Sequence, residues 1–110
     1  MRFLCLAYGD EAGWSSLSED EKQDALAHDA VIRDRGNLMS AVQSRVTSVR
    51  NQDGNLEVSE TNTSKKKQLP LAGFSVIEAA DLDEVIGLVS DTPCARARGV
   101  IEIYPFRDIV

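Results

Sequence analysis

Asp10 and Glu11, which close the first apolar run of the chain, are the first residues that could do chemistry. They follow Arg2–Tyr8, at the point where a predicted strand passes into a loop, and functional side chains are common at such positions. His28 is the only histidine. A carboxylate beside an imidazole orients the ring and fixes its charge or tautomer, so that the ring can move a proton near neutral pH. Asp10 and His28 are therefore the candidate catalytic pair, if the fold brings them together.

Each of these residues also has a structural interpretation. Asp10 and Glu11 can cap the turn that follows Gly9, and His28 can be a half-buried or surface residue of a helix. Trp14, in the same loop as Asp10, can form the wall of a pocket or cover the start of the next helix. Glu11 and Trp14 are candidate ligand-binding residues, and both interpretations stay open at this point.

Other kinds of site are not indicated. The sequence has no glycine-rich dinucleotide loop, phosphate loop, nucleophile elbow or paired-cysteine motif, so we expect no cofactor. Cys5 and Cys94 lack metal-ligand spacing, and one histidine cannot complete a zinc set with them. The net charge of −6 argues against nucleic acid or an anionic membrane as a partner. Without a signal peptide or a membrane-spanning run, a cytoplasmic location is expected.

The elements that must position the candidates form two strand–helix–strand units. The first consists of a strand at 2–8, a helix starting at Ser18 and a strand at 41–50; the second of a strand at 71–79, a helix starting at Asp81 and a strand at 99–106. Two such units predict one α+β domain over residues 1–110, a ferredoxin-like sandwich with two helices on one face of an antiparallel sheet.

The middle of the chain predicts a hairpin and an exposed connection. Asp53-Gly54 between β-branched runs is a strong hairpin signal, which places a hairpin over Val46–Val58. Ser59–Gln68 is polar and includes three consecutive lysines, so we interpret it as an exposed connection.

The predicted strands at the two ends of the chain are apolar on both faces. Alternation puts Leu4, Leu6 and Tyr8 on one face of the first strand and Phe3, Cys5 and Ala7 on the other. Helices can cover only one face, so we expect a second copy of the chain to cover the other, in a homodimer. In the first helix, steps of 100° group an apolar arc that we expect to face the core: Leu26, Ala27, Ala30 and Val31.

Several strings of residues together resemble the YCII-related proteins, in their DGPF-type branch. The strings are Leu6-Ala-Tyr-Gly-Asp-Glu11, Thr47-Ser-Val-Arg50, Leu71-Ala-Gly-Phe74, Ile77–Glu84, Pro93–Arg96 and Gly99–Pro105. The resemblance covers nearly the whole chain. It implies a ferredoxin-like domain of the dimeric α+β barrel type, a bacterial homodimer packed sheet to sheet, and in some relatives a link to a sigma-factor pathway. It also implies an Asp–His pair as the family's proposed active site.

The chain departs from this family in two places. The Asp-Gly-Pro-Phe signature is replaced by Ser59-Glu-Thr-Asn-Thr-Ser64, so no function attached to that signature carries over. Asp10 matches the family aspartate, whereas the position of the family histidine falls near Ala25, one turn before His28. Arg50, at the end of a matched string, joins Glu11 and Trp14 as a candidate ligand-binding residue.

Two functions of different classes follow from these residues. One is a dimeric module that binds a small molecule and has an accessory or regulatory role. The alternative is a small-molecule lyase or hydrolase that uses Asp10 and His28 as an acid–base pair. The missing signature and the displaced histidine favour the binding module, and the separation of Asp10 from His28 in the assembled dimer distinguishes the two.

Overall fold

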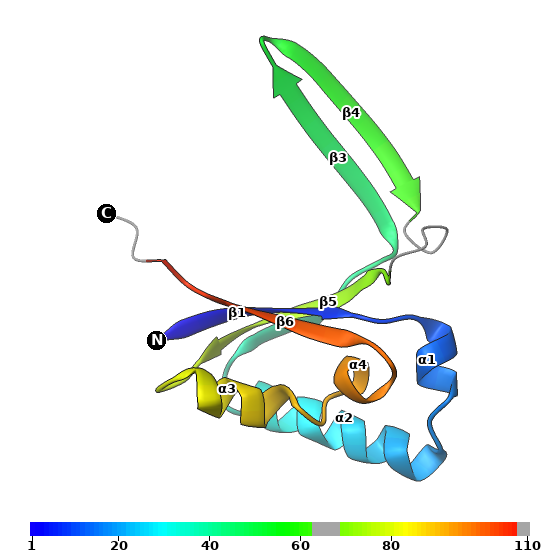
Figure 1. Ribbon diagram of the computed structural model, residues 1–110, viewed down its shortest axis with the longest axis vertical. Coiled ribbons are helices and arrows are strands. Elements are labelled where there is room, and N and C mark those ends of the chain that lie inside the picture. The colour runs from blue at the N-terminus through cyan, green and yellow to red at the C-terminus, as the bar shows by residue number, and fades with distance from the viewer. Residues whose placement is uncertain (63–68, 108–110) are drawn as a thin grey trace.

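A four-stranded antiparallel sheet with helices on one face forms the body of the protein (Figure 1). The computed structural model describes residues 1–62 and 69–107. The strand order is β2-β5-β1-β6, from Leu38–Ala41, Leu71–Glu78, Arg2–Tyr8 and Val100–Pro105. The helices are α1 (Glu11–Ser15), α2 (Glu19–Asp34), α3 (Leu82–Val89) and α4 (Pro93–Arg96). This order of two interleaved strand–helix–strand units is the ferredoxin-like α+β sandwich that the sequence predicts.

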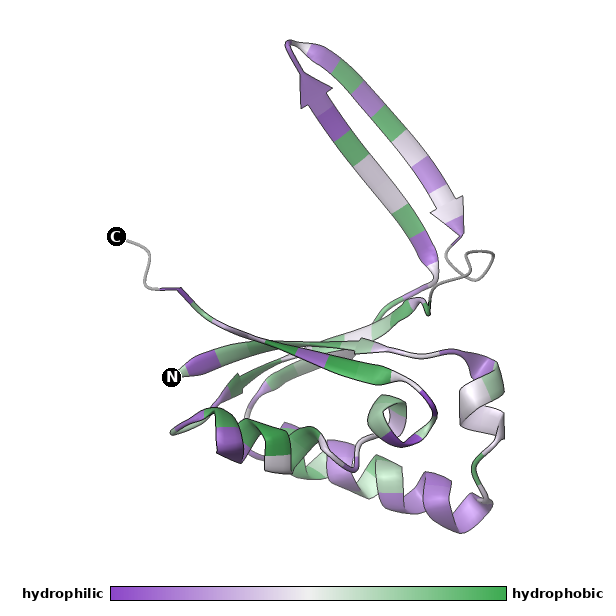
Figure 2. Ribbon diagram, in the orientation of Figure 1, coloured by the Kyte–Doolittle hydropathy of each residue, from purple (hydrophilic) through white to green (hydrophobic). Residues whose placement is uncertain are grey.

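The hairpin predicted at Asp53-Gly54 is present and forms a sheet of its own. It consists of β3 (Arg45–Gln52) and β4 (Asn55–Asn62) and extends away from the sandwich (Figure 1). Asp53 and Gly54 have φ angles of 54° and 79°, the left-handed geometry that matches the twist of a two-residue hairpin turn. Both strands are mainly polar, with a few apolar residues spaced along them (Figure 2). The predicted connection Ser59–Gln68 is strand as far as Asn62, and its lysines, Lys65–Lys67, lie outside the described residues.

The strand predicted at 41–50 is wrong in its position. The sheet takes up β2, which ends at Ala41 and pairs with β5 through Leu38–Val76 and Ala41–Gly73. Most of the predicted segment belongs instead to β3 of the hairpin. The Asp-Gly turn determines where the hairpin lies. The edge strand of the sheet is therefore formed by the residues directly after α2.

The core lies between the sheet and the two longer helices. Phe3, Ile77, Ile32 and Val85 are the largest fully buried side chains. The apolar arc predicted for α2 is wrong, because the helix buries Ala25 and Ile32 instead, whereas Leu26 and Val31 are 46% and 51% exposed. The face of α2 that packs against the sheet therefore has fewer large apolar residues than the predicted face.

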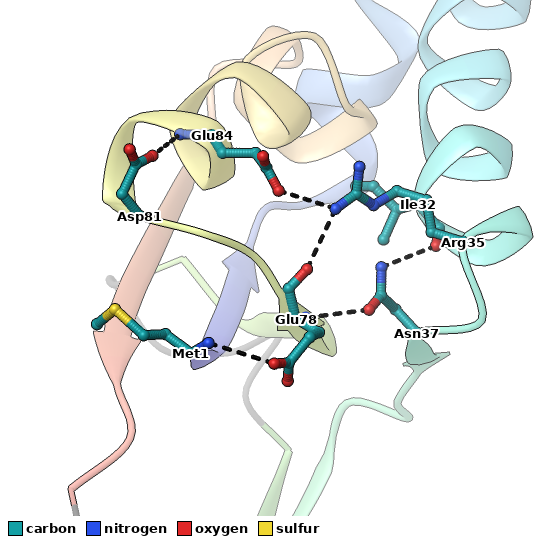
Figure 3. Close-up of polar contacts among 7 residues, drawn as sticks. All are labelled: Met1, Ile32, Arg35, Asn37, Glu78, Asp81 and Glu84. Atoms are coloured by element: carbon teal, nitrogen blue, oxygen red, sulfur yellow. Dashed lines mark hydrogen bonds and ion pairs between the residues drawn. The ribbon is translucent and has the colours of Figure 1, made fainter.

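Side-chain contacts fix the ends of the helices to the sheet (Figure 3). Asn37, just after α2, donates to the Ile32 carbonyl and accepts from the Glu78 amide, each at 3.1 Å. Arg35 donates to the Glu78 carbonyl at 3.2 Å and pairs with Glu84 of α3 at 2.9 Å. At the other end of α2, Ser18 and Glu21 form the predicted capping box. These contacts hold both long helices in one orientation over β5.

The face of the sheet opposite the helices is apolar, and no helix of the described residues covers it (Figure 1). Strand register places Leu4 beside Val76 and Tyr104, and Leu6 beside Phe74. The edge strands contribute Leu38, which is 61% exposed, and Tyr104, which is 47% exposed. The two-faced apolar character expected from the sequence is therefore present.

Candidate functional site

A hollow lies at the carboxyl end of β1 and contains both acidic residues that follow this strand, Asp10 and Glu11. This strand-end hollow measures about 730 Å³ and is lined by Asp10, Glu11 and Trp14, together with residues at the start of β5 and on α4. Its other lining includes Val42, Leu69, Pro93 and Cys94. Binding sites for small molecules commonly have about this volume, at 300–1,000 Å³.

Asp10 is held in place by the short helix that it starts. It is the N-cap of α1, and its Oδ1 accepts a hydrogen bond from the Gly13 amide at 2.8 Å. Gly13 is buried against α4, where a Cβ atom would lie 2.0 Å from the Ala97 carbonyl oxygen. The capping interpretation of Asp10 is therefore correct for one oxygen, and the same residue still lines the hollow.

Trp14 forms part of the wall of the hollow from the next turn of α1. The Lys22 ammonium of α2 lies 5.8 Å from the centre of its ring, within the range of a cation–π contact. The indole thus both lines the hollow and contacts the start of α2, so that the two interpretations of Trp14 hold together.

His28 lies on the outer flank of α2, in different surroundings from Asp10. Its Nε2 is 3.8 Å from Asp24 Oδ2 and 4.0 Å from Asp91 Oδ2, and Asp24 also pairs with Arg96 at 2.5 Å. Within residues 1–62 and 69–107, His28 does not line the strand-end hollow, and no hydrogen bond or ion pair joins it to Asp10.

Arg50 lies near the tip of the β3–β4 hairpin. It is exposed and pairs in register with Glu57, three residues from the turn. Within a single chain, Asp10, Glu11 and Trp14 therefore line the same hollow. His28 and Arg50 do not line it.

A second hollow, the inner pocket, lies between α2 and the sheet. It measures about 410 Å³ and is lined by Asp29, Ile32 and Arg33 of α2 and by residues of β1, β2, β5 and β6. Ala72, Pro93 and Cys94 line both hollows, so these two spaces share a wall.

Burial raises the pKa of three ionisable groups that line the inner pocket, Cys5, Asp29 and Cys94. Desolvation raises the pKa of Asp29, although the nearby Arg33 guanidinium lowers it. Burial also raises the pKa of the Cys94 thiol, with a further contribution from the negative charge of Asp29. A half-buried acid of this kind in a cleft is a candidate functional group.

Comparison with known proteins identifies the family. The YCII-related domain matches residues 1–110. The chain belongs to the YCII-related family. A similar solved structure is 5-chloro-2-hydroxyhydroquinone dehydrochlorinase (TftG) from Burkholderia phenoliruptrix AC1100, in complex with 2,5-dihydroxybenzoquinone. It has a TM-score of 0.44 and 18% identity, and the match covers 93% of this chain and 91% of that chain. No curated protein gives a significant match.

Neither a metal centre nor a membrane span is found in the described part of this YCII-related protein. Across residues 1–62 and 69–107, no group of three or more His, Cys, Asp or Glu side chains is placed to hold a metal ion. In the same ranges, no helix has the length and apolar character needed to cross a membrane.

Sequence reasoning missed Asp29 because it assigned the wrong face of α2 to the core. Ala25, Asp29 and Ile32 follow the i, i+4, i+7 spacing of one helix face. On this face of the YCII-related domain, Asp29 falls between two fully buried residues. An acid flanked in this way by apolar residues was the available signal, and the more apolar neighbouring arc concealed it.

Proposed function

We propose that the protein binds a small molecule in the strand-end hollow and acts as a binding or accessory module. The observation that carries the proposal is that Asp10, Glu11 and Trp14 line one hollow of about 730 Å³. Two carboxylates beside an indole suit a ligand with an apolar ring and hydrogen-bond donors, because carboxylates accept and the ring offers apolar contact.

The surroundings of His28 favour binding over acid–base turnover. General acid–base catalysis needs the imidazole within hydrogen-bond reach of the reacting group, or within one bridging water of it. In a single chain, His28 contacts Asp24 and Asp91 and is absent from the lining of this hollow. The acid–base alternative thus requires a partner chain to bring an imidazole to Asp10.

Trp14 provides a direct test, because it is the only tryptophan of the chain. Small aromatic compounds that carry hydroxyl or amino groups are titrated into the protein while the fluorescence of Trp14 is recorded. A saturable change is expected for a ligand of the hollow, and Glu11→Gln should weaken that ligand several-fold. Glu57→Gln, an equal change of charge in the hairpin, is the matched control and should leave the affinity unchanged. Equal effects of the two substitutions would refute the site.

The proposed assembly is a homodimer that buries the helix-free face of the sheet. Leu4, Leu6, Phe74 and Val76 lie on that face by register and are half-buried in the single chain. Each 100 Å² of apolar surface removed from water contributes about 2.5 kcal/mol. A second copy presents the same face, which satisfies the self-complementarity of a two-fold interface.

Two substitutions of equal chemistry test this assembly. Val100, on the helix-free face, is 47% exposed, and Ile86, on α3, is 44% exposed. Val100→Glu should give a monomer at micromolar concentration in light scattering, because it would bury a carboxylate in the interface. Ile86→Glu should remain a dimer. A monomeric unmodified protein at that concentration would disprove the assembly.

A further inference from the structure

The inner pocket lies over a row of the sheet in which three of the four strands carry small residues, and the fourth strand, β6, carries Ile101. Strand register aligns Ala7, Gly73 and Ala41 across β1, β5 and β2, all of them on the helix-covered face. Four residues further along the strands, Phe3 pairs with Ile77, and both of these large side chains are fully buried in the same layer. Interiors are normally packed without such gaps, so the small row leaves space under α2.

Gly73 cannot be enlarged without moving a strand. A Cβ at this position would lie 2.8 Å from the Ser40 carbonyl oxygen and 3.3 Å from the Ala41 Cα. The small row is therefore part of how β2 and β5 approach one another, and the space above it is a permanent feature of the fold.

Asp29 is the acidic group that α2 places over this space. It lines the pocket with Ile32 and Arg33, whereas the floor of the pocket is formed by small or apolar residues. Asp29 is half-buried, and within the described residues its carboxylate accepts no hydrogen bond from the protein and forms no ion pair with it. The Arg33 guanidinium stabilises this carboxylate only in part, because desolvation remains the larger effect. A partly desolvated carboxylate without a hydrogen-bond donor is costly in stability, and a ligand that donates a hydrogen bond would offset this cost.

We propose that the inner pocket binds a compact, mainly apolar molecule through a hydroxyl group that donates a hydrogen bond to Asp29. The apolar body of the ligand lies over the row formed by Ala7, Gly73 and Ala41, in contact with Ile32. The volume of about 410 Å³ admits a single-ring compound. This site is separate from the proposed strand-end site, although Cys94 lies in the wall that they share.

Cyclohexanol and cyclohexanone make a matched pair of probes, because both have the same ring and only the alcohol can donate to a carboxylate. Each is titrated into the full chain labelled with ¹³C and ¹⁵N, at a pH where the carboxyl carbon shift shows Asp29 to be ionised. We expect amide shifts at Ala7, Gly73 and Ile32, and an affinity about tenfold higher for the alcohol, the size expected for a hydrogen bond to a charged group.

Three variants make the test specific. Asp29→Asn keeps the shape and should abolish the preference for the alcohol, whereas Asp34→Asn makes the same change of charge on exposed Asp34 of α2 and should retain it. Ala7→Leu fills the pocket and should abolish binding of both probes. Equal affinities for the two probes in the unmodified protein, or shifts confined to Trp14 and its neighbours, would overturn the proposal; the second result would leave the strand-end site standing.

Discussion

Replacing Gly13 by alanine should destabilise the protein, whereas the same replacement at Gly87 should stabilise it. Both glycines lie in helices, α1 and α3. At position 13 the new Cβ would lie 2.0 Å from the Ala97 carbonyl oxygen, but at position 87 no atom lies within 4 Å. The contact at position 13 is more than 1 Å too short, so α1 must move away from α4, and overpacking of this kind costs about 1–3 kcal/mol.

The expected gain at position 87 comes from the backbone alone. Alanine in a helix interior is favoured over glycine by about 0.5–1 kcal/mol, because alanine loses less backbone conformational freedom than glycine when the chain folds. The two variants should therefore differ in free energy of unfolding by about 1.5–4 kcal/mol. Since about 1 kcal/mol moves the midpoint of a domain of this size by roughly 4 °C, the difference is well within the reach of thermal and urea unfolding at one protein concentration.

Gly13→Ala should also disturb the strand-end hollow. The Gly13 amide holds Asp10 Oδ1, and α1 carries Trp14. A displaced α1 should shift the emission of Trp14 and weaken any ligand of the hollow, and neither change is expected for Gly87→Ala. If Gly13→Ala proved as stable as Gly87→Ala, the close packing of α1 on α4 would be refuted.

Three further predictions concern the helices and the buried ionisable groups. Ser18→Ala removes the cap of α2 and should lower the free energy of unfolding by about 1 kcal/mol in urea. Because burial raises the pKa of Asp29 in the folded state, the contribution of Asp29 to stability falls as the pH rises from 3.8 through that higher value. In urea unfolding, the free energy of unfolding of Asp29→Asn should therefore increase relative to that of the unmodified protein over this pH interval. A difference between the two proteins that does not change with pH would contradict the reasoning. Burial raises the pKa of both Cys5 and Cys94, so both thiols should react with Ellman's reagent at pH 8 more slowly than free cysteine; a faster reaction of Cys94 would refute its burial.

The parts of the fold that were predictable from the sequence are those decided by local chemistry. Ser18 with Glu21 makes a capping box, and Asp53-Gly54 makes a hairpin turn, because the residues that interact are neighbours in the chain. The alternation of β1 likewise places Phe3 and Cys5 on the buried face. The acidic pair and Trp14 reach one hollow for the same reason, since all lie within five residues.

What was not predictable depends on contacts between distant segments. The choice of β2 as the edge strand rests on the pairing of Leu38 with Val76, and the face that α2 buries rests on how Ile32 fits between the sheet and α3. Asp29 becomes a candidate only after that face is known. The alignment of Ala7 with Gly73 is also a result of register, which single-strand patterns do not contain.

The β3–β4 hairpin has a consequence for the order in which the sheet assembles. β2 ends at Ala41 and β5 begins at Leu71, and the hairpin takes up most of the chain between them. Once Arg45 pairs with Asn62 at its base, the open loop that must close shrinks to about eleven residues, which lowers the entropy cost of closure by about 0.9 kcal/mol. Hairpins form within about 1–10 μs, before strands far apart in sequence meet. The hairpin thus brings β2 to β5 early, and weakening its turn should slow folding of the sheet without removing any contact from the sandwich.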